Sequence, residues 1–159
     1  MPTIDQAIDD FLAQQRIAVA GVSREPRGAH AGNGVYERLK ACGYQVFAVN
    51  PNADSVMGDP CYHSLAEIPG GVDAVVIVTR PEVAPSVVEE CRQLGINRVW
   101  MHRSFGQGSV SKEAHQACRD AGITCIAGAC PLMYGATSDG GHRFMKAMLG
   151  IFGGLPKGV

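Results

Sequence analysis

The sequence predicts a three-layer, doubly wound α/β domain with a mainly parallel, five-stranded sheet. Five short apolar runs begin 29, 28, 25 and 24 residues apart, and each is continuous rather than alternating. Continuous apolar runs are typical of strands that are buried on both faces of a parallel sheet. Helix-length segments separate the runs, which gives the βαβ rhythm of right-handed parallel crossovers. The runs are residues 17–20, 46–49, 74–78, 99–101 and 123–127.

The helices are predicted from apolar spacing and from the residues that end them. One helix within residues 1–15 precedes the first strand. Three helices between strands end at Gly43, Gly95 and Gly122, because glycine readily adopts the left-handed conformation that ends a helix. The tail, residues 140–159, contains one short amphipathic segment, which predicts a helix that docks on the sheet or on a second subunit. Residues 50–69 show no clear element before residues 64–67.

Length and charge restrict the classes of protein that remain. A chain of 159 residues predicts a single domain, residues 1–159. The net charge of −1 removes the main reason to expect nucleic acid or an anionic membrane as a partner. The longest apolar run, residues 74–78, is far shorter than the ~20 residues that span a bilayer. The opening residues lack the basic and apolar regions of a targeting segment, so a cytoplasmic location is expected.

The six cysteines predict reduced thiols rather than disulfides or a metal site. No two of them have the C-x-x-C spacing of zinc-binding or redox motifs. Four are expected to be buried as small apolar side chains. Cys130 differs, because it follows the last strand, where its thiol would meet a ligand thiol or simply pack in the core. The four cysteines expected in the core are Cys42, Cys91, Cys118 and Cys125.

A ligand site is expected at one edge of the predicted sheet. Open α/β sheets bind ligands beyond the carboxyl ends of their strands, where the strand order reverses. The first loop at this edge combines Gly21 and Ser23 with Arg24 and Arg27 before the next helix. Glycine lets the backbone approach a phosphate, and arginine and a helix N-terminus both favour a bound anion. The loop therefore predicts phosphate binding.

A nicotinamide dinucleotide is disfavoured as this phosphate ligand. The G-x-G-x-x-G fingerprint is absent from the end of the first strand. An acidic residue should also end the second strand to hold the ribose diol of NAD. Here that strand is followed by Asn50-Pro51-Asn52, which contains no carboxylate. An NAD(P)-dependent oxidoreductase on this fold is therefore a second hypothesis.

Four motifs resemble, in the same order over residues 16–134, the small stand-alone CoA-binding proteins of bacteria. These proteins are similar to the N-terminal domain of the succinyl-CoA synthetase alpha subunit. The resemblance implies a Rossmann-like fold that holds coenzyme A or an acyl-CoA rather than a nicotinamide. The four motifs are Gly21-Val22-Ser23-Arg24, Val49-Asn50-Pro51, Val78-Thr79-Arg80-Pro81 and Cys130-Pro131.

The resemblance also implies which residues contact the ligand. The chain departs from the family pattern at Asn52, where many relatives have lysine. Either Arg24 or Arg27 would supply the missing positive charge, or the affinity for CoA would be weak or lost. The implied contacts are Gly21, Val22, Ser23 and Arg24, with Arg27, near the pyrophosphate; Asn50, Pro51 and Asn52 on the nucleotide side; Val78, Thr79, Arg80 and Pro81 at the adenine; and Met101, His102 and Arg103 near the pantetheine arm.

The leading functional hypothesis is a CoA-binding module without chemistry of its own. The ligase relatives need a second domain with a phosphorylated histidine, and this chain is too short to contain one. His142 resembles such a site only superficially. His102 and Arg103 are expected to contact the ligand or to shape their loop, since no nucleophile or carboxylate partner is evident. A third hypothesis is an interaction module with a degenerate nucleotide site, and a homodimer is expected from the apolar tail.

Overall fold

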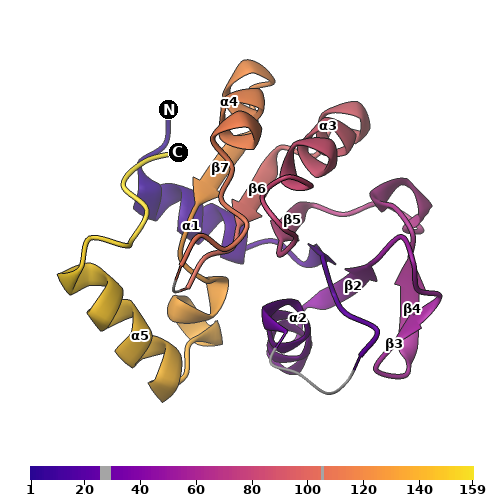
Figure 1. Cartoon of the computed structure of the whole chain (residues 1–159), viewed down its shortest axis with the longest axis horizontal. Helices are drawn as coiled ribbons and strands as arrows, with labels where there is room; N and C mark the ends of the chain where they lie inside the picture. The colour runs from indigo at the N-terminus through magenta and orange to yellow at the C-terminus, as the bar shows by residue number, and fades with distance from the viewer. Residues whose placement is uncertain (26–29, 105) are drawn as a thin grey trace.

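The computed structural model of the chain describes residues 1–25, 30–104 and 106–159. These residues form a seven-stranded sheet in the order β3-β4-β2-β1-β5-β6-β7 (Figure 1). Neighbouring strands are parallel, except that β3 and β4 are antiparallel. The strands are β1 (Arg16–Ala20), β2 (Gln45–Val49), β3 (Ser55–Val56), β4 (Asp59–Tyr62), β5 (Ala74–Ile77), β6 (Arg98–Met101) and β7 (Thr124–Ala127).

The predicted α/β class and mainly parallel sheet are confirmed, but the strand count is wrong. The five apolar runs are β1, β2, β5, β6 and β7, which lie in the order 2-1-3-4-5 when these runs alone are numbered. This is the flavodoxin-type order of doubly wound sheets. The two additional strands, β3 and β4, lie in the stretch that showed no clear element. Strand β3 has two residues and β4 has four, among them Pro60. Both strands are too short and too polar to form an apolar run.

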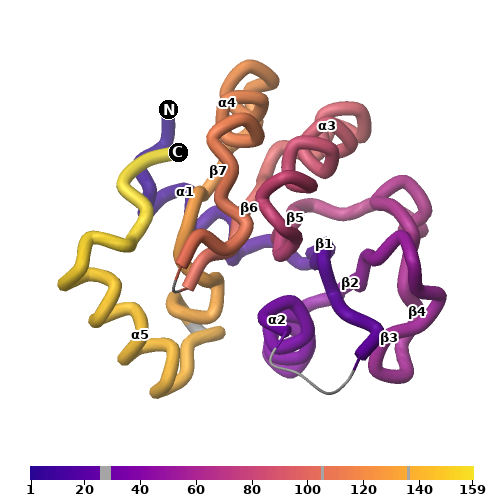
Figure 2. Tube along the Cα trace, in the orientation of Figure 1, coloured from indigo at the N-terminus to yellow at the C-terminus, as the bar shows by residue number. Residues whose placement is uncertain are grey.

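Helices cover both faces of the sheet and give three layers. Helices α1, α2 and α5 share one core cluster with the sheet, whereas α3 and α4 share the other. Figures 1 and 2 show α3 and α4 on one side of the sheet and α2 and α5 on the opposite side. The helices are α1 (Ile4–Leu12), α2 (Ala31–Ala41), α3 (Ala84–Leu94), α4 (Lys112–Asp120) and α5 (Gly140–Ile151), with short 3-10 turns η1 (Leu65–Glu67), η2 (Pro131–Met133) and η3 (Gly135–Thr137).

Each helix between parallel strands ends at its predicted glycine. Gly95 is the C-cap residue of α3 and has a φ of 70°, which is the left-handed conformation that a Cβ disfavours. Gly43 and Gly122 follow the C-cap residues of α2 and α4 and also have positive φ. These ends return the chain to the amino-terminal edge of the sheet, so that each following strand runs parallel to the one before.

The largest buried side chain anchors α1 and the last strands to each other. The Trp100 ring meets the Phe11 ring edge-on at 5.3 Å between centroids, and the Trp100 indole Nε1 donates to the Gly128 carbonyl at 2.8 Å. Helix α5 packs on η2 and buries Leu149. The core under the sheet is therefore continuous from the N-terminal helix to the C-terminal helix.

None of the described helices combines the length and the apolar character that a membrane crossing requires. All six cysteines are free thiols in the structure. Cys91, Cys118 and Cys125 are buried as expected, and so is Cys130. The expectation was wrong for Cys42, which is only partly buried because it caps the end of α2 rather than facing the sheet.

Candidate functional site

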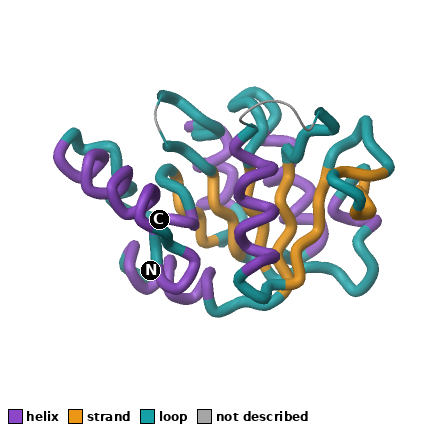
Figure 3. The backbone as a smooth tube through the Cα atoms, turned by 90° about the horizontal axis from the view of Figure 1, so that it is seen from below, coloured by secondary structure: helices purple, strands orange, loops and turns teal. Residues whose placement is uncertain are grey.

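The strand order reverses beside β1, between the loops after β1 and β5. Strand β1 pairs with β2 on one side and with β5 on the other. The chain leaves β1 for α2 on one face and leaves β5 for α3 on the opposite face. Loops gather beyond the carboxyl ends of the strands (Figure 3). Doubly wound sheets bind their ligands at this reversal.

Two glycines bring three backbone segments into direct contact at this reversal. Gly21 has a φ of +113°, and a Cβ there would lie 2.6 Å from the carbonyl carbon and oxygen of Val78. A Cβ on Gly32, in the first turn of α2, would lie 2.7 Å from the Gly21 carbonyl oxygen. The end of β5, the loop after β1 and the start of α2 therefore pack at distances that only glycine permits.

The Asn33 side chain clamps the first loop to α2. Its Oδ1 accepts a hydrogen bond from the Ser23 backbone N at 2.8 Å, and its Nδ2 donates to the Ser23 carbonyl at 3.1 Å. Asn33 is buried and Ser23 is partly buried, and these two bonds hold Ser23 in one orientation. The Ser23 hydroxyl accepts from the Glu25 backbone N at 3.2 Å. Sequence reasoning missed Asn33, although a polar residue on the buried face of the first helical turn was a usable signal.

Asn50 braces the loop after β2 against the loop after β1. Its Nδ2 donates to the Val22 carbonyl at 2.8 Å, and its Oδ1 accepts from the Asn52 backbone N at 2.8 Å. The Asn50 amide is thus engaged within the protein, while Pro51 and Asn52 are exposed. Asn50 supports the loop geometry, and Pro51 and Asn52 are the residues of this motif that a ligand could contact.

A first cavity lies between the loops after β5 and β6, and we call it the Thr79 cavity. Its volume is about 350 Å³, within the usual range of small-molecule sites. The Ser109 hydroxyl donates to the Thr79 carbonyl at 2.5 Å and ties the two loops together. The cavity is lined by Ala31, Val78, Thr79, Arg80, Pro81, His102, Ser104, Gly108 and Ser109.

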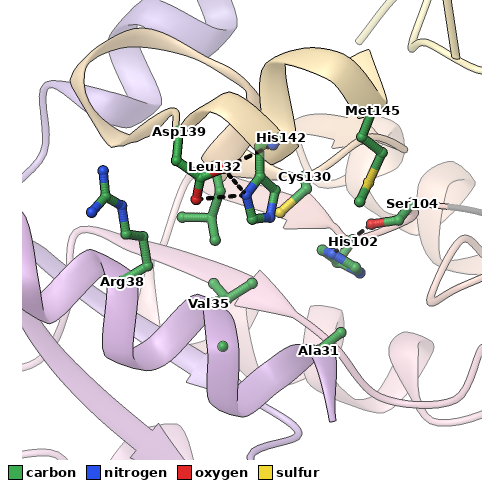
Figure 4. A pocket seen from close by; sticks show the side chains of 11 residues that line it. Ala31, Val35, Arg38, His102, Ser104, Cys130, Leu132, Asp139, His142 and Met145 are labelled. Carbon is green, nitrogen blue, oxygen red and sulfur yellow. Dashed lines mark hydrogen bonds and ion pairs between the residues drawn. The ribbon is translucent and has the colours of Figure 1, made fainter. Parts of the chain in front are cut away.

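A second cavity of about 330 Å³ adjoins the first, and we call it the His142 cavity (Figure 4). The two cavities share Ala31, His102 and Ser104 as lining residues. Together they form a path from the end of β5 to the space between α2 and α5. The His142 cavity is lined by Ala31, Gly34, Val35, Arg38, His102, Ser104, Cys130, Leu132, Asp139, His142 and Met145.

His102 lies at the junction of the two cavities and is uncharged at neutral pH. It is buried, and its Nε2 is 3.4 Å from the Ser104 hydroxyl. Burial, with a smaller contribution from His142, lowers the pKa of His102 to about 4, because low polarity disfavours the charged imidazole. His102 can therefore offer a ligand a neutral hydrogen-bonding group but no positive charge.

The structure brings most of the predicted site residues that it describes to one edge, but Met101 and Arg103 line neither cavity. Met101 is buried in the core under α3 and α4 and lines neither cavity. The Arg103 guanidinium donates through Nη2 to the Gly154 carbonyl at 3.2 Å, so it holds the C-terminal segment. Arg27 lies outside the described residues. Those gathered at the edge are Gly21, Val22, Ser23, Arg24, Asn50, Pro51, Asn52, Val78, Thr79, Arg80, Pro81 and His102.

Burial makes Cys130 a poor nucleophile. Its side chain is 1% exposed, and burial raises the pKa of its thiol to about 12, so almost none of it is thiolate at neutral pH. Within the described ranges, no three histidine, cysteine or acidic side chains are grouped as metal ligands would be.

The partly buried Cys42 should react with alkylating agents well before Cys130. We expect iodoacetamide at pH 8 to label Cys42 roughly tenfold faster in the native protein, because thiolate fraction and access set the rate. Peptide mass spectrometry after timed quenching measures both sites. In urea the two rates should converge. Equal native rates would contradict the buried position of Cys130.

Comparison with known proteins identifies the family. A family model described as "CoA binding domain" matches residues 15–136, which is most of the chain. The chain belongs to this family. The resemblance found in the sequence is thereby confirmed, and the match covers β1 to β7 with the first loop, the Asn50 loop and the Thr79 loop. It ends before α5.

Relatives of this CoA-binding family member include stand-alone proteins and much larger enzymes. The protein YneT of Bacillus subtilis is 35% identical over 117 residues, which cover 73% of this chain and 82% of YneT. The ADP-forming acetate–CoA ligase I of Archaeoglobus fulgidus is 39% identical over 75 residues, 47% of this chain and 11% of the ligase. A hypothetical protein from Pyrococcus horikoshii has the same fold, with a TM-score of 0.73 and 28% identity over 83% of this chain and 92% of that one.

Proposed function

We propose that the chain binds coenzyme A, or an acyl-CoA, at the carboxyl edge of its sheet. The proposal rests on the position of the loop of residues 21–24. Hydrogen bonds from Asn33 and Asn50 fix this loop beside the first turn of α2. This loop lies at the reversal of strand order in a chain of the CoA-binding family. The CoA pyrophosphate would meet this loop and the positive end of α2 there.

Two adjoining cavities fit the remaining parts of the ligand. In this proposal the adenine lies against residues 78–81 in the Thr79 cavity, and the pantetheine arm passes His102. Arg24 and Arg80 are exposed at the same edge and would pair with the phosphates, which would supply the positive charge that Asn52 lacks. The role is that of a binding module, and any reaction on bound CoA would depend on a partner.

A ligand panel in a thermal-shift experiment tests the proposal. Because CoA would bind the folded chain alone, CoA at ~100 times its dissociation constant should stabilise the fold by about 2.7 kcal/mol. We expect shifts with CoA and acetyl-CoA and none with NAD or NADP. A shift with NADP alone would support the oxidoreductase hypothesis instead. The absence of a shift with every ligand would support a degenerate site.

Arg24→Ala should weaken CoA binding without changing the stability of the fold. Arg24 is exposed, so its guanidinium contributes little to folding, whereas a charge-assisted contact to phosphate is lost. We expect a five- to tenfold higher dissociation constant, or about 1 kcal/mol, by calorimetric titration. Arg119→Ala, which removes an exposed arginine of α4, is the control and should bind CoA normally. Unchanged binding by Arg24→Ala would place the phosphates elsewhere.

A cytoplasmic location and a homodimer are further proposals that rest on the sequence. The tail supports the homodimer with three large apolar side chains, Phe144, Ile151 and Phe152, each more than two-thirds exposed. Light scattering on the purified chain measures the mass directly. A monomer at high micromolar concentration would contradict the homodimer.

A further inference from the structure

The chain continues past its family-matched residues, and this continuation forms one wall of the His142 cavity. The match ends at residue 136, whereas Asp139, His142 and Met145 line the cavity. They lie across the cavity from Ala31 and Val35 of α2 (Figure 4). The first loop and the Thr79 cavity belong to the matched part. The His142 cavity thus contains side chains that lie beyond the residues matched by the family model.

Asp139 holds the imidazole of His142 in one orientation. The Asp139 carboxylate caps α5 by accepting from the His142 backbone N at 2.8 Å. The same carboxylate is 2.9 Å from the ring Nδ1 through both of its oxygens. These hydrogen bonds keep the pKa of Asp139 below its usual range, so the carboxylate is charged and Nδ1 carries a proton that it donates. With Nδ1 bonded to the carboxylate, Nε2 is the ring nitrogen left to accept a hydrogen bond.

The remaining walls of the His142 cavity suit a thin, uncharged chain. Val35, Leu132 and Met145 make them largely apolar. The positive charge of Arg38 offsets the negative charge of Asp139, and the Arg38 Nε donates to the Thr137 carbonyl at 3.1 Å. A pantetheine arm is uncharged and ends in a thiol, which is a hydrogen-bond donor. It matches the cavity better than an acyl chain that ends in a carboxylate, because Asp139 would repel that carboxylate.

We propose that the thiol end of CoA enters the His142 cavity and that Nε2 of His142 accepts the thiol proton. The proposal rests on the CoA binding proposed above and assigns the far end of the same ligand. When the thiol reacts, its S–H bond breaks, the proton moves to Nε2, and an imidazolium forms beside Asp139. The electron pair stays on sulfur as a thiolate, which is the nucleophilic form. Helix α5 would thus prepare CoA to accept an acyl group from a partner.

The first test compares CoA with its nucleotide fragment 3′,5′-ADP, which lacks the pantetheine arm. His142→Ala should raise the dissociation constant of CoA about three- to tenfold in calorimetric titrations and leave that of 3′,5′-ADP unchanged. His63→Ala is the matched control, because His63 pairs with Asp54 at 2.8 Å away from both cavities. It should change neither constant. Equal effects of His142→Ala on both ligands, or no effect, would overturn the proposal.

The second test measures the reactivity of the bound thiol. CoA saturated with protein is treated with iodoacetamide at constant pH, and S-alkylated CoA is measured after the protein is removed. Alkylation displaces iodide and joins the sulfur to the reagent carbon. We expect bound CoA to react at least about tenfold faster than free CoA, with the gain lost in His142→Ala. An equal or slower rate would overturn the activation of the thiol.

The two tests separate this proposal from the one on which it rests. If neither CoA nor 3′,5′-ADP binds the native chain, the proposed CoA site is wrong. If both ligands bind and His142→Ala changes their dissociation constants equally, the proposed CoA site is correct but the thiol end of CoA lies outside the His142 cavity. The α5 fold is retained in His142→Ala, because Asp139 caps the helix through the backbone N of residue 142.

Discussion

Gly21→Ala should destabilise the fold by about 2–5 kcal/mol and abolish the ligand site. A Cβ at a φ of +113° is strained, and it would also lie 2.6 Å from the Val78 carbonyl group. Left-handed strain costs about 1–2 kcal/mol and overpacking about 1–3 kcal/mol. For a chain of this size that corresponds to a fall in Tm of roughly 5–20 °C. Any protein that folds should bind CoA weakly, because the loop can no longer approach β5.

Gly34→Ala is the matched control and should change stability in the opposite direction. Gly34 lies within α2, and a Cβ there would meet no atom of the described residues within 4 Å. Alanine at an unhindered helical position stabilises by about 0.5–1 kcal/mol relative to glycine. Scanning calorimetry measures both variants. Equal Tm values for the two would refute the close packing of the first loop on β5.

Asn33→Leu should lower CoA affinity about a hundredfold, or by about 2.7 kcal/mol. Leucine has a similar size but leaves the backbone N and carbonyl of Ser23 without their partners. A polar group that loses its partner costs up to about 1–3 kcal/mol where water cannot replace that partner, and Ser23 is partly buried, so we expect the loop to leave its present position. The ligand must then supply the free energy that orders the loop again, and its affinity falls by that amount.

Calorimetric titration with CoA and chemical denaturation measure the two effects of Asn33→Leu separately. The affinity loss should exceed any loss expected from Arg24→Ala, because Asn33 positions the whole loop rather than one side chain. Asn97→Leu, at an exposed asparagine before β6, should bind CoA as the native chain does. A stable Asn33→Leu protein with native CoA affinity would show that the orientation of Ser23 does not matter for binding.

The sequence predicted the fold best where apolar residues formed a regular pattern over a whole helix or strand. Five buried strands had continuous apolar runs and three glycine-ended helices had apolar residues at helical spacing, and these elements are present in the structure. Strands β3 and β4 were missed because two or four residues at a sheet edge show no periodicity. The register with which β1 pairs with β2 and β5 could not be predicted from the sequence, because it depends on which strands become neighbours in the folded sheet.

The sequence was more informative about the backbone positions of the candidate site than about its side chains. Glycine and asparagine after a strand are local signals, so residues 21–24 and Asn50 could be assigned to the carboxyl edge of the sheet. The burial of Met101 in the core could not be predicted, because a strand buried on both faces hides which residue points to which layer. The contact of Arg103 with Gly154 could not be predicted either, because the two residues are 51 positions apart. Asn33 and the pair of Asp139 and His142 act through contacts that form only when α2 and α5 pack beside their loops.

The most direct test of the CoA site is an amide chemical-shift titration of the ¹⁵N-labelled chain with CoA. We expect the largest changes at residues 21–24, at Asn52 and at residues 79–80. The amide chemical shifts of α4, which lies in the opposite layer, should not change and serve as the internal control. Saturable changes confined to the carboxyl edge of the sheet would support the account. Changes centred elsewhere, or none at millimolar CoA, would contradict it.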